Sequence, residues 1–149
     1  MFHFRTAMYS ALLTTFLGLG ACSMAPTTSH SSAMTARLSG ASEAPPVTSN
    51  GSGTVEANLN KQTNVLSWTV TYSGLSGPAT AGHFHGPAMA GQNAGVAVPI
   101  TGSLDSPITG MATLTAAQAA ELMAGNWYVN LHTAANPKGE IRGQVTVRP

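Results

Sequence analysis

The chain has 149 residues, of which 43% are hydrophobic and only 7% are charged, and its formal net charge at pH 7 is +1. Apart from its N-terminal end, this length fits one domain of ordinary size. A near-neutral chain without a basic cluster offers no electrostatic surface for nucleic acid, which excludes that class of partner. The single cysteine, Cys22, excludes an internal disulfide and a cysteine metal cluster.

Residues 1–21 have the layout of a secretory signal peptide. Arg5 supplies the early positive charge, and residues 7–19 form an apolar stretch too short to span a bilayer, which takes roughly 20 residues. The segment ends in Leu-Gly-Ala followed by Cys22, which resembles the lipobox of bacterial lipoproteins. The resemblance implies acylation of Cys22, for example with palmitate, and a lipid anchor in a membrane. An ordinary signal peptide with a chance cysteine is the alternative.

The residues after Cys22 predict where the protein lies and where its domain begins. Ser23 follows the cysteine, and no Asp is present there to suggest inner-membrane retention, so we expect an outer-membrane lipoprotein of the cell envelope, facing the periplasm or the exterior. Residues 22–34 are mostly Ser, Thr, Pro and Ala and cannot form a core, so they are predicted to be a flexible tether. Residues 35–149 are then the folded domain.

The folded part alternates apolar and polar residues with period two, which is typical of half-buried strands. The clearest strand covers residues 65–72, and a short polar link joins it to residues 54–59, which predicts an antiparallel hairpin. Trp68 and, in a later strand, Trp127 are predicted to be buried. Further strands are predicted at residues 35–40, 80–85, 95–100, 108–114, 126–133 and 140–147.

One helix is predicted after residue 114. Thr115 and Gln118 match a capping box, and Gly125 is a natural C-terminal stop. About eight short strands separated by turn residues imply an all-β fold. We therefore expect a Greek-key β-sandwich or a flattened barrel of about eight strands with one short helix.

Three histidines in two of these strands are candidate metal ligands. His83 and His85 are two apart on one strand, so their imidazoles face the same side, roughly 6–7 Å apart along it. In the strand at residues 126–133 the apolar alternation faces the core and sends His132 to the opposite side. Three neutral imidazoles suit copper or zinc, and copper binds more tightly in the usual divalent order. The sequence leaves open whether the two strands are neighbours.

Three further residues could support this site. Met89 follows the histidine pair in a loop, where its thioether could complete a Cu(I) site or could simply fill the loop. Glu43 and Glu140 lie in tight turns, where either could orient a histidine, form a salt bridge or cap backbone amides. No paired carboxylates at catalytic spacing, nucleophile elbow or phosphate-binding glycine loop are present.

Several segments together resemble the CHRD (chordin-type) domain. They are LSGASEAPPV at residues 38–47, YSGLSG at 72–77, AGHFHGP at 81–87, the junction at 114–127 and NPKGEIRGQ at 136–144. The resemblance extends over about residues 36–147. In animals the family is named for an extracellular antagonist of growth factors, and bacterial members are mostly exported proteins. The family therefore implies a fold and a location outside the cytoplasm.

The histidine pattern also has a weaker similarity to the copper site of copper/zinc superoxide dismutase, itself a Greek-key sandwich. Arg142 could imitate the arginine that guides anions in that enzyme. The disulfide is impossible here, and the bridging histidine and the aspartate of the zinc site have no counterpart.

Three functions follow from these patterns. The first is a membrane-anchored, non-enzymatic lipoprotein that binds a metal ion, copper or alternatively zinc, through His83, His85 and His132. The second is an extracytoplasmic protein-interaction or adhesive module without metal. The third is a redox enzyme of the superoxide dismutase type. The protein partner and the oligomeric state stay open.

Overall fold

The computed structural model describes Met1 and residues 30–149. The predicted signal peptide, Cys22 and most of the predicted tether lie outside the described residues. The described part forms nine strands and two helical segments: β1 (Ser31–Ser39), η1 (Gly40–Ser42), β2 (Ser52–Asn60), β3 (Val65–Ser73), β4 (Ala79–His85), β5 (Val96–Pro99), β6 (Ile108–Thr113), α1 (Ala116–Met123), β7 (Tyr128–Thr133), β8 (Ile141–Gln144) and β9 (Thr146–Val147).

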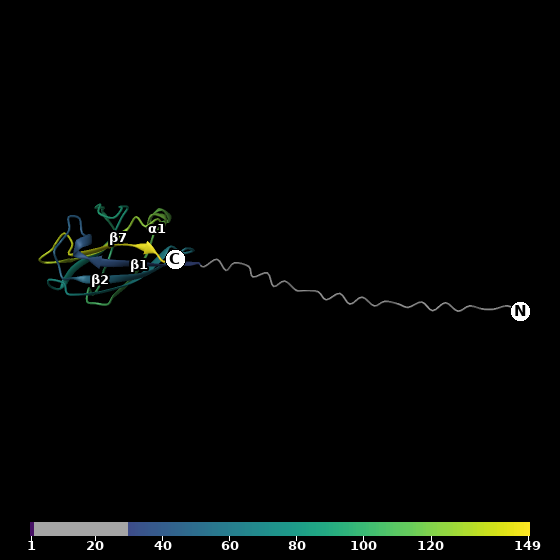
Figure 1. Ribbon diagram of the computed structural model, residues 1–149, viewed down its shortest axis with the longest axis horizontal. Coiled ribbons are helices and arrows are strands. Elements are labelled where there is room, and N and C mark those ends of the chain that lie inside the picture. The colour runs from purple at the N-terminus through teal and green to yellow at the C-terminus, as the bar shows by residue number, and fades with distance from the viewer. Residues whose placement is uncertain (2–29) are drawn as a thin grey trace.

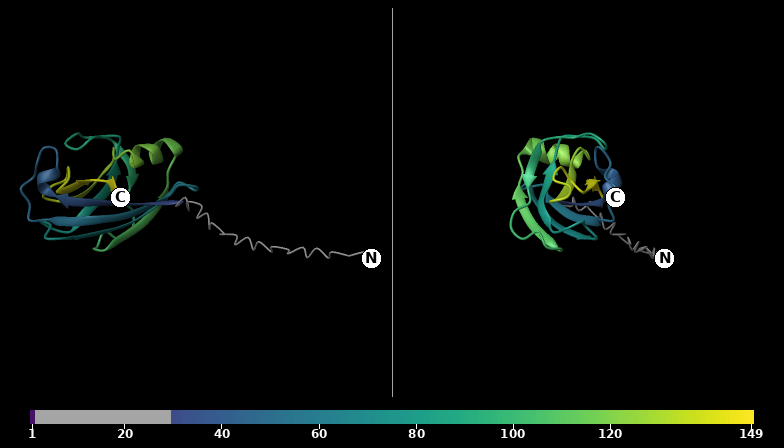
Figure 2. Two further views of the ribbon diagram at one scale, coloured as in Figure 1. Left: turned by 45° about the vertical axis from the view of Figure 1, so that its right-hand side comes forward. Right: turned by 90° about the vertical axis from the view of Figure 1, so that its left-hand side faces the viewer.

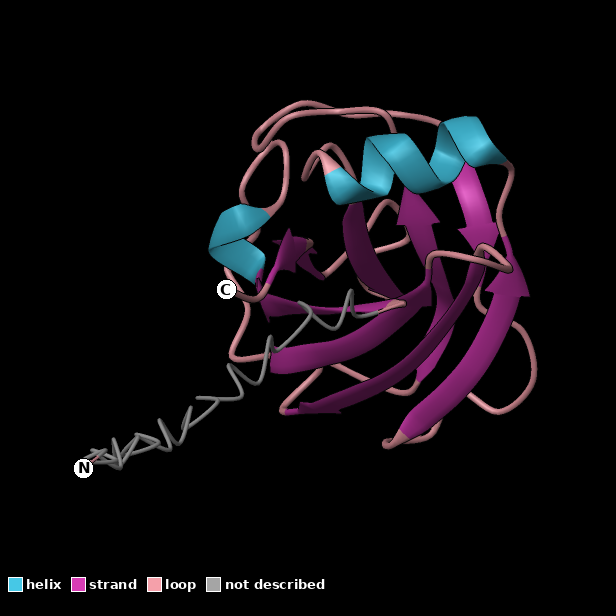
Figure 3. Cartoon of the chain, turned by 90° about the vertical axis from the view of Figure 1, so that its right-hand side faces the viewer, coloured by secondary structure: helices cyan, strands magenta, loops and turns pink. Residues whose placement is uncertain are grey.

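These strands belong to one antiparallel sheet in the order β5-β4-β7-β8-β1-β2-β3-β6, with β9 beside β1. The sheet curls into a nearly closed barrel (Figure 1, Figure 2). Helix α1 lies across one end of that barrel (Figure 3). The expected all-β class is confirmed in its flattened-barrel form, with one short α-helix that begins at the predicted capping box of Thr115 and Gln118.

The predicted hairpin is formed by β2 and β3, which pair antiparallel along their full length. The register places Val55 opposite Val70 and Leu59 opposite Leu66, so that apolar residues of both strands share the inner face. Asn64, which is in the connecting turn, has a φ of 55°, a left-handed conformation that asparagine adopts more readily than most residues. The period-two pattern therefore gave the correct face for both strands.

A row of three aromatic rings connects opposite parts of the core. The ring centroids of Trp68 and Phe84 are 5.0 Å apart, and those of Phe84 and Trp127 are 6.5 Å apart. Both tryptophans are buried, as predicted, and Phe84 is fully buried. Gly110 pairs with Trp68 across β3 and β6, and a Cβ on Gly110 would lie 2.5 Å from the indole. The absence of a side chain there makes room for the ring.

Two strands differ most from the sequence prediction. β1 begins at Ser31, so residues 31–34 of the predicted tether are part of a strand. The mainly polar composition of these residues does not indicate a strand, but Met34 faces inward and is fully buried. Each residue of the segment pairs with β2 through the backbone, and such pairing does not depend on side-chain type. The predicted strand at residues 140–147 is divided into two, because β8 pairs mainly with β7 whereas β9 pairs with β1.

Truncation of Trp68 tests the assignment of the inner face. Trp68→Ala should lower the free energy of unfolding by about 3–5 kcal/mol, because the loss of a buried indole leaves a cavity. Urea denaturation measures the difference. Met111→Ala, at a side chain that is 73% exposed on β6, is the control and should stay within about 0.5 kcal/mol of the wild type. Equal stability of both variants would show that the indole does not contribute to the core.

Candidate metal centre

The two histidine-bearing strands are neighbours. β4 and β7 pair antiparallel, and the register sets His83 opposite Asn130 and His85 opposite Tyr128. Phe84 on β4 and Leu131 on β7 are fully buried in the core. Because successive side chains of a strand point to opposite faces, the histidines lie on the outer face of the barrel.

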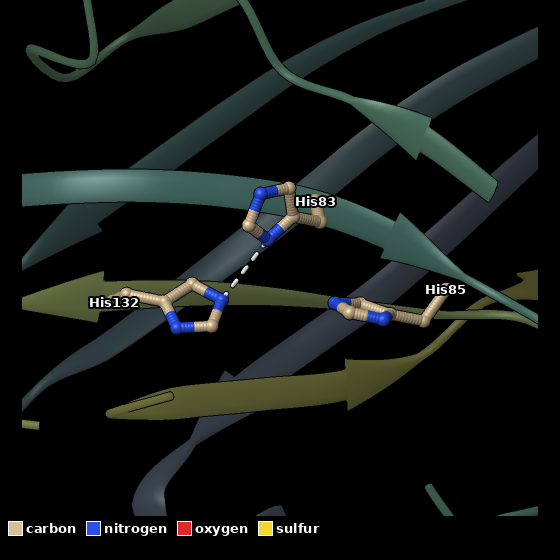
Figure 4. Close-up of side chains that lie close together, drawn as sticks. All are labelled: His83, His85 and His132. Atoms are coloured by element: carbon tan, nitrogen blue, oxygen red, sulfur yellow. Dashed lines mark hydrogen bonds between the residues drawn. The ribbon is translucent and has the colours of Figure 1, made fainter. Parts of the chain in front are cut away.

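The three predicted ligands come together on that outer face. One ring nitrogen from each of His83, His85 and His132 can be chosen so that all three lie within 4.8 Å of one another. Nδ1 of His83 is 3.1 Å from Nε2 of His132, and these two rings point toward one another over β4 and β7 (Figure 4). His85 and His132 are only 8% and 9% exposed, and His83 is partly exposed. The cluster is therefore reachable from solvent through His83.

Backbone carbonyls orient two of the rings. Nδ1 of His85 is 3.0 Å from the carbonyl oxygen of Ala94, and Nδ1 of His132 is 3.1 Å from that of Pro137. A carbonyl oxygen can only accept, so Nδ1 carries the hydrogen in both rings. In the neutral form this leaves the lone pair on Nε2 of each ring, which is the form that a metal ion binds.

Burial favours the neutral form of His83 and His132. It lowers the pKa of His83 below 6.5, and the neighbouring His132 and His85 lower it further by charge repulsion. Burial also lowers the pKa of His132, while the hydrogen bond to Pro137 raises it and His85 lowers it again. Both rings therefore have an available lone pair at neutral pH.

The ring of His85 is held in a stack. It lies parallel to the ring of Tyr128, with 4.7 Å between centroids and 5° between planes. Cζ of Arg142 lies 3.3 Å from the centroid of the same tyrosine ring. Because β4 and β8 flank β7 on opposite sides, His85 and Arg142 approach Tyr128 from its two sides.

Arg142 is 1% exposed and lies beneath the β4–β5 loop rather than at the surface. Its guanidinium donates to the side-chain oxygen of Asn93 at 3.0 Å and to the carbonyl of Gln92 at 2.5 Å. The structure thus gives Arg142 a role in holding this loop over the site. Met89, in the same loop, is 68% exposed.

Glu43 lies beside Asn130, which the sequence patterns did not indicate as a site residue. The carboxyl of Glu43 is 7% exposed; burial raises its pKa, whereas the charge of Arg142 and a hydrogen bond from Asn130 lower it. A Cβ on Gly139 would lie 2.3 Å from Oε1 of Glu43 and 2.7 Å from Nδ2 of Asn130. Only a glycine leaves space for this pair.

Asn130 itself contacts two of the histidines. Its Oδ1 lies 3.0 Å from Nε2 of His85 and 3.0 Å from Nε2 of His132, and its side chain is 3% exposed. The alternation of β7 could have revealed it, since Asn130 shares a face with His132. Its role depends on the pairing with β4, which the sequence does not show.

Glu140 has a structural role at the end of this face. Oε1 accepts from Ser49 Oγ at 2.7 Å and from the backbone N–H of Ser76 at 2.8 Å. Oε2 accepts from Ser76 Oγ at 2.5 Å and from Thr133 Oγ1 at 2.6 Å. Burial raises the pKa of this fully buried carboxyl, but the four hydrogen bonds outweigh that effect and lower the pKa to about 2. Glu140 therefore connects the loops that contain Ser49 and Ser76 to Thr133 of β7. The bond from the backbone N–H of Ser76 also caps that amide.

A pocket of about 540 Å³ borders the histidine cluster. His85, Tyr128 and Asn130 contribute to its wall, together with Glu43 and residues 135–139. Of the three histidines, His85 is the one that lines this pocket. Among residues 30–149, no helix has the length and apolarity needed to cross a membrane.

Fold and site together define a small antiparallel barrel domain whose outer face bears a three-histidine cluster. The family model for the CHRD domain matches residues 34–145. The match covers most of the chain, so the protein belongs to the CHRD domain family, which confirms the resemblance seen in its sequence. Comparison with the curated proteins and with the solved structures gave no match.

The low pKa of Glu140 predicts a defined acid sensitivity. The unfolded chain should have the usual value of 4.5 and the folded chain about 2. The stabilisation is then complete above about pH 4.5 and disappears as the pH falls toward 2; this difference corresponds to about 3 kcal/mol. Glu140→Gln should lower the free energy of unfolding at pH 7 and flatten its decline between these pH values.

Urea unfolding at a series of pH values measures this effect. Glu56→Gln is the matched control, because the side chain of Glu56 is 51% exposed and pairs with Arg148 at the surface. It should retain the wild-type acid profile. The assignment fails if Glu140→Gln retains that profile as well.

Proposed function

We propose that this CHRD domain binds one transition-metal ion through His83, His85 and His132, and that the ion is copper. The observation that supports the proposal is the convergence of three imidazole nitrogens within 4.8 Å. A metal bound at about 2.0–2.1 Å from each nitrogen requires pairs no more than about 4.2 Å apart, so a small inward movement of the widest pair completes the site.

The electrostatics of the cluster favour a cation. Two of the rings direct Nε2 lone pairs at the same region, because their Nδ1 hydrogens are engaged by the carbonyls of Ala94 and Pro137. Ligating histidines in metal sites are commonly oriented in this way. The lowered pKa values of His83 and His132 favour the neutral rings that a metal requires.

Copper is the preferred ion, with zinc as the alternative. Imidazole suits both, and copper forms the more stable complex in the usual divalent order. We further propose that Cys22 is acylated and anchors the mature protein in the outer membrane of the cell envelope. A non-enzymatic domain of this kind would serve copper buffering or handling outside the cytoplasm.

Titration of the purified domain with Cu(II) tests the site. The wild type should bind one ion, and His83→Ala, His85→Ala and His132→Ala should each weaken binding by roughly tenfold or more, because each loses one of three nitrogen ligands. His30→Ala is the matched control, since His30 is exposed and precedes β1. Equal affinity in all five proteins would refute the site and favour an interaction module without metal.

The lipid anchor is tested in bacterial cells. Cys22→Ala should abolish acylation and release the protein from the membrane fraction, because the thiol is the point of lipid attachment. Fractionation followed by detection of the protein measures the change, with Ser23→Ala as the control that keeps the anchor. Membrane retention of Cys22→Ala equal to that of the wild type would contradict the lipoprotein assignment.

A further inference from the structure

We infer that Asn130 supplies a fourth ligand, its side-chain carbonyl oxygen, and that the resulting site of three nitrogens and one oxygen takes a divalent ion rather than Cu(I). The inference rests on the proposed metal site and names its coordination and the class of ion. Glu43 acts as a positioning residue for the amide of Asn130.

The distances match those between ligands of one ion. Two donors at about 2.0–2.1 Å from a metal are roughly 2.9–3.4 Å apart when they are neighbours in square-planar or tetrahedral geometry. Oδ1 of Asn130 lies 3.0 Å from Nε2 of both His85 and His132, and Nε2 of His132 lies 3.1 Å from Nδ1 of His83. Asn130 is therefore already at ligand spacing from two of the imidazoles.

These contacts are not ordinary hydrogen bonds when the rings are neutral. The hydrogens of His85 and His132 are on Nδ1, engaged by backbone carbonyls, so both Nε2 atoms are acceptors. Oδ1 of Asn130 is an acceptor too, and the side chain is 3% exposed, which limits the access of water. Nε2 of His132 accepts a hydrogen bond from Nδ1 of His83. Nε2 of His85 and Oδ1 of Asn130 are two acceptors that face one another in a buried place and repel, and a cation between them converts the repulsion into binding.

Glu43 determines which end of the amide faces the histidines. A Cβ on Gly139 would lie 2.7 Å from Nδ2 of Asn130 and 2.3 Å from Oε1 of Glu43, so both atoms face this glycine. Oε1 of Glu43 is buried and has no hydrogen-bond partner within the described residues. The hydrogen bond from Asn130 lowers the pKa of Glu43, as a donor to a carboxylate does. A reversed amide would set its oxygen against this carboxylate, so the NH₂ group is directed at Glu43 and Oδ1 at the metal site.

The donor set selects the ion. Cu(I) prefers soft thioether or thiolate ligands, whereas imidazole combined with a carbonyl oxygen suits divalent copper and zinc. The nearest thioether along the chain, that of Met89, is 68% exposed, in contrast to the buried Asn130. The geometry therefore favours Cu(II) or Zn(II).

The test compares the Cu(II), Zn(II) and Cu(I) affinities of the full folded domain by competition with chelators. Asn130→Ala should weaken Cu(II) and Zn(II) binding roughly 10- to 100-fold and leave Cu(I) binding nearly unchanged. Asn130→Asp, which keeps an oxygen in the same place, should retain divalent binding. Asn58→Ala, at an exposed position of β2, is the matched control. Thermal unfolding of each variant verifies the fold, and Asn130→Ser replaces Asn130→Ala if the latter does not fold.

Electron paramagnetic resonance of the Cu(II) form gives a readout that a purely structural role would not change. Asn130→Ala should alter the copper parameters while coupling to three nitrogens persists. Glu43→Ala should weaken Cu(II) binding in the wild-type background but have no further effect in the Asn130→Ala background, because it acts through Asn130.

The two proposals fail differently. If the histidine variants lose Cu(II) but Asn130→Ala retains the wild-type affinity and spectrum, the fourth ligand is overturned and the three-histidine site stands. Tighter binding of Cu(I) than of Cu(II) by the wild type would overturn the preference for a divalent ion. If the wild type binds neither Cu(II) nor Zn(II), the metal site and the fourth ligand fail together.

Discussion

The inward packing of Phe84 is the contact on which the geometry of the site depends. Phe84 is fully buried between Trp68 and Trp127, and it stands between His83 and His85 in β4. Since a strand alternates its side chains between two faces, fixing Phe84 in the core fixes both histidines on the outer face. The buried residues of β7 do the same for its outward residues. The core therefore determines the face on which the polar cluster lies.

A cluster on the outer face of a barrel would ordinarily be solvated, and here loops cover it. Arg142 and Glu140 are almost fully buried. The guanidinium of Arg142 donates to a backbone oxygen and a side-chain amide oxygen of the β4–β5 loop. The carboxylate of Glu140 accepts mainly from loop hydroxyls and a backbone N–H. Buried charges are tolerated when such hydrogen bonds offset the cost of desolvation. The same bonds fix the loops in place, and the burial that the loops provide lowers the pKa of His83 and His132. Loop anchoring and histidine chemistry are thus consequences of one buried polar layer.

The sequence predicted the local features of this arrangement and missed the nonlocal ones. Alternation within a strand assigned His83, His85 and His132 to outward faces, because a side chain's face depends only on its neighbours along the chain. The pairing of β4 with β7 joins residues 49 apart, and no local pattern specifies it. Asn130 was missed for this reason, since its partners come from another strand and from the Glu43 loop. The early start of β1 was missed because its polar residues pair through the backbone.

Three of the segments that resemble the CHRD domain also build the covered face. Residues 38–47 contribute Glu43, residues 81–87 contribute the histidine pair, and residues 136–144 contribute Gly139 beneath which Glu43 meets Asn130. The buried carboxyl of Glu43, the amide of Asn130 and the imidazoles lie in the same region, and burying polar groups costs free energy that hydrogen bonds or a bound ligand must offset. These segments therefore meet in the polar layer over β4 and β7, where the proposed cation would offset part of that cost.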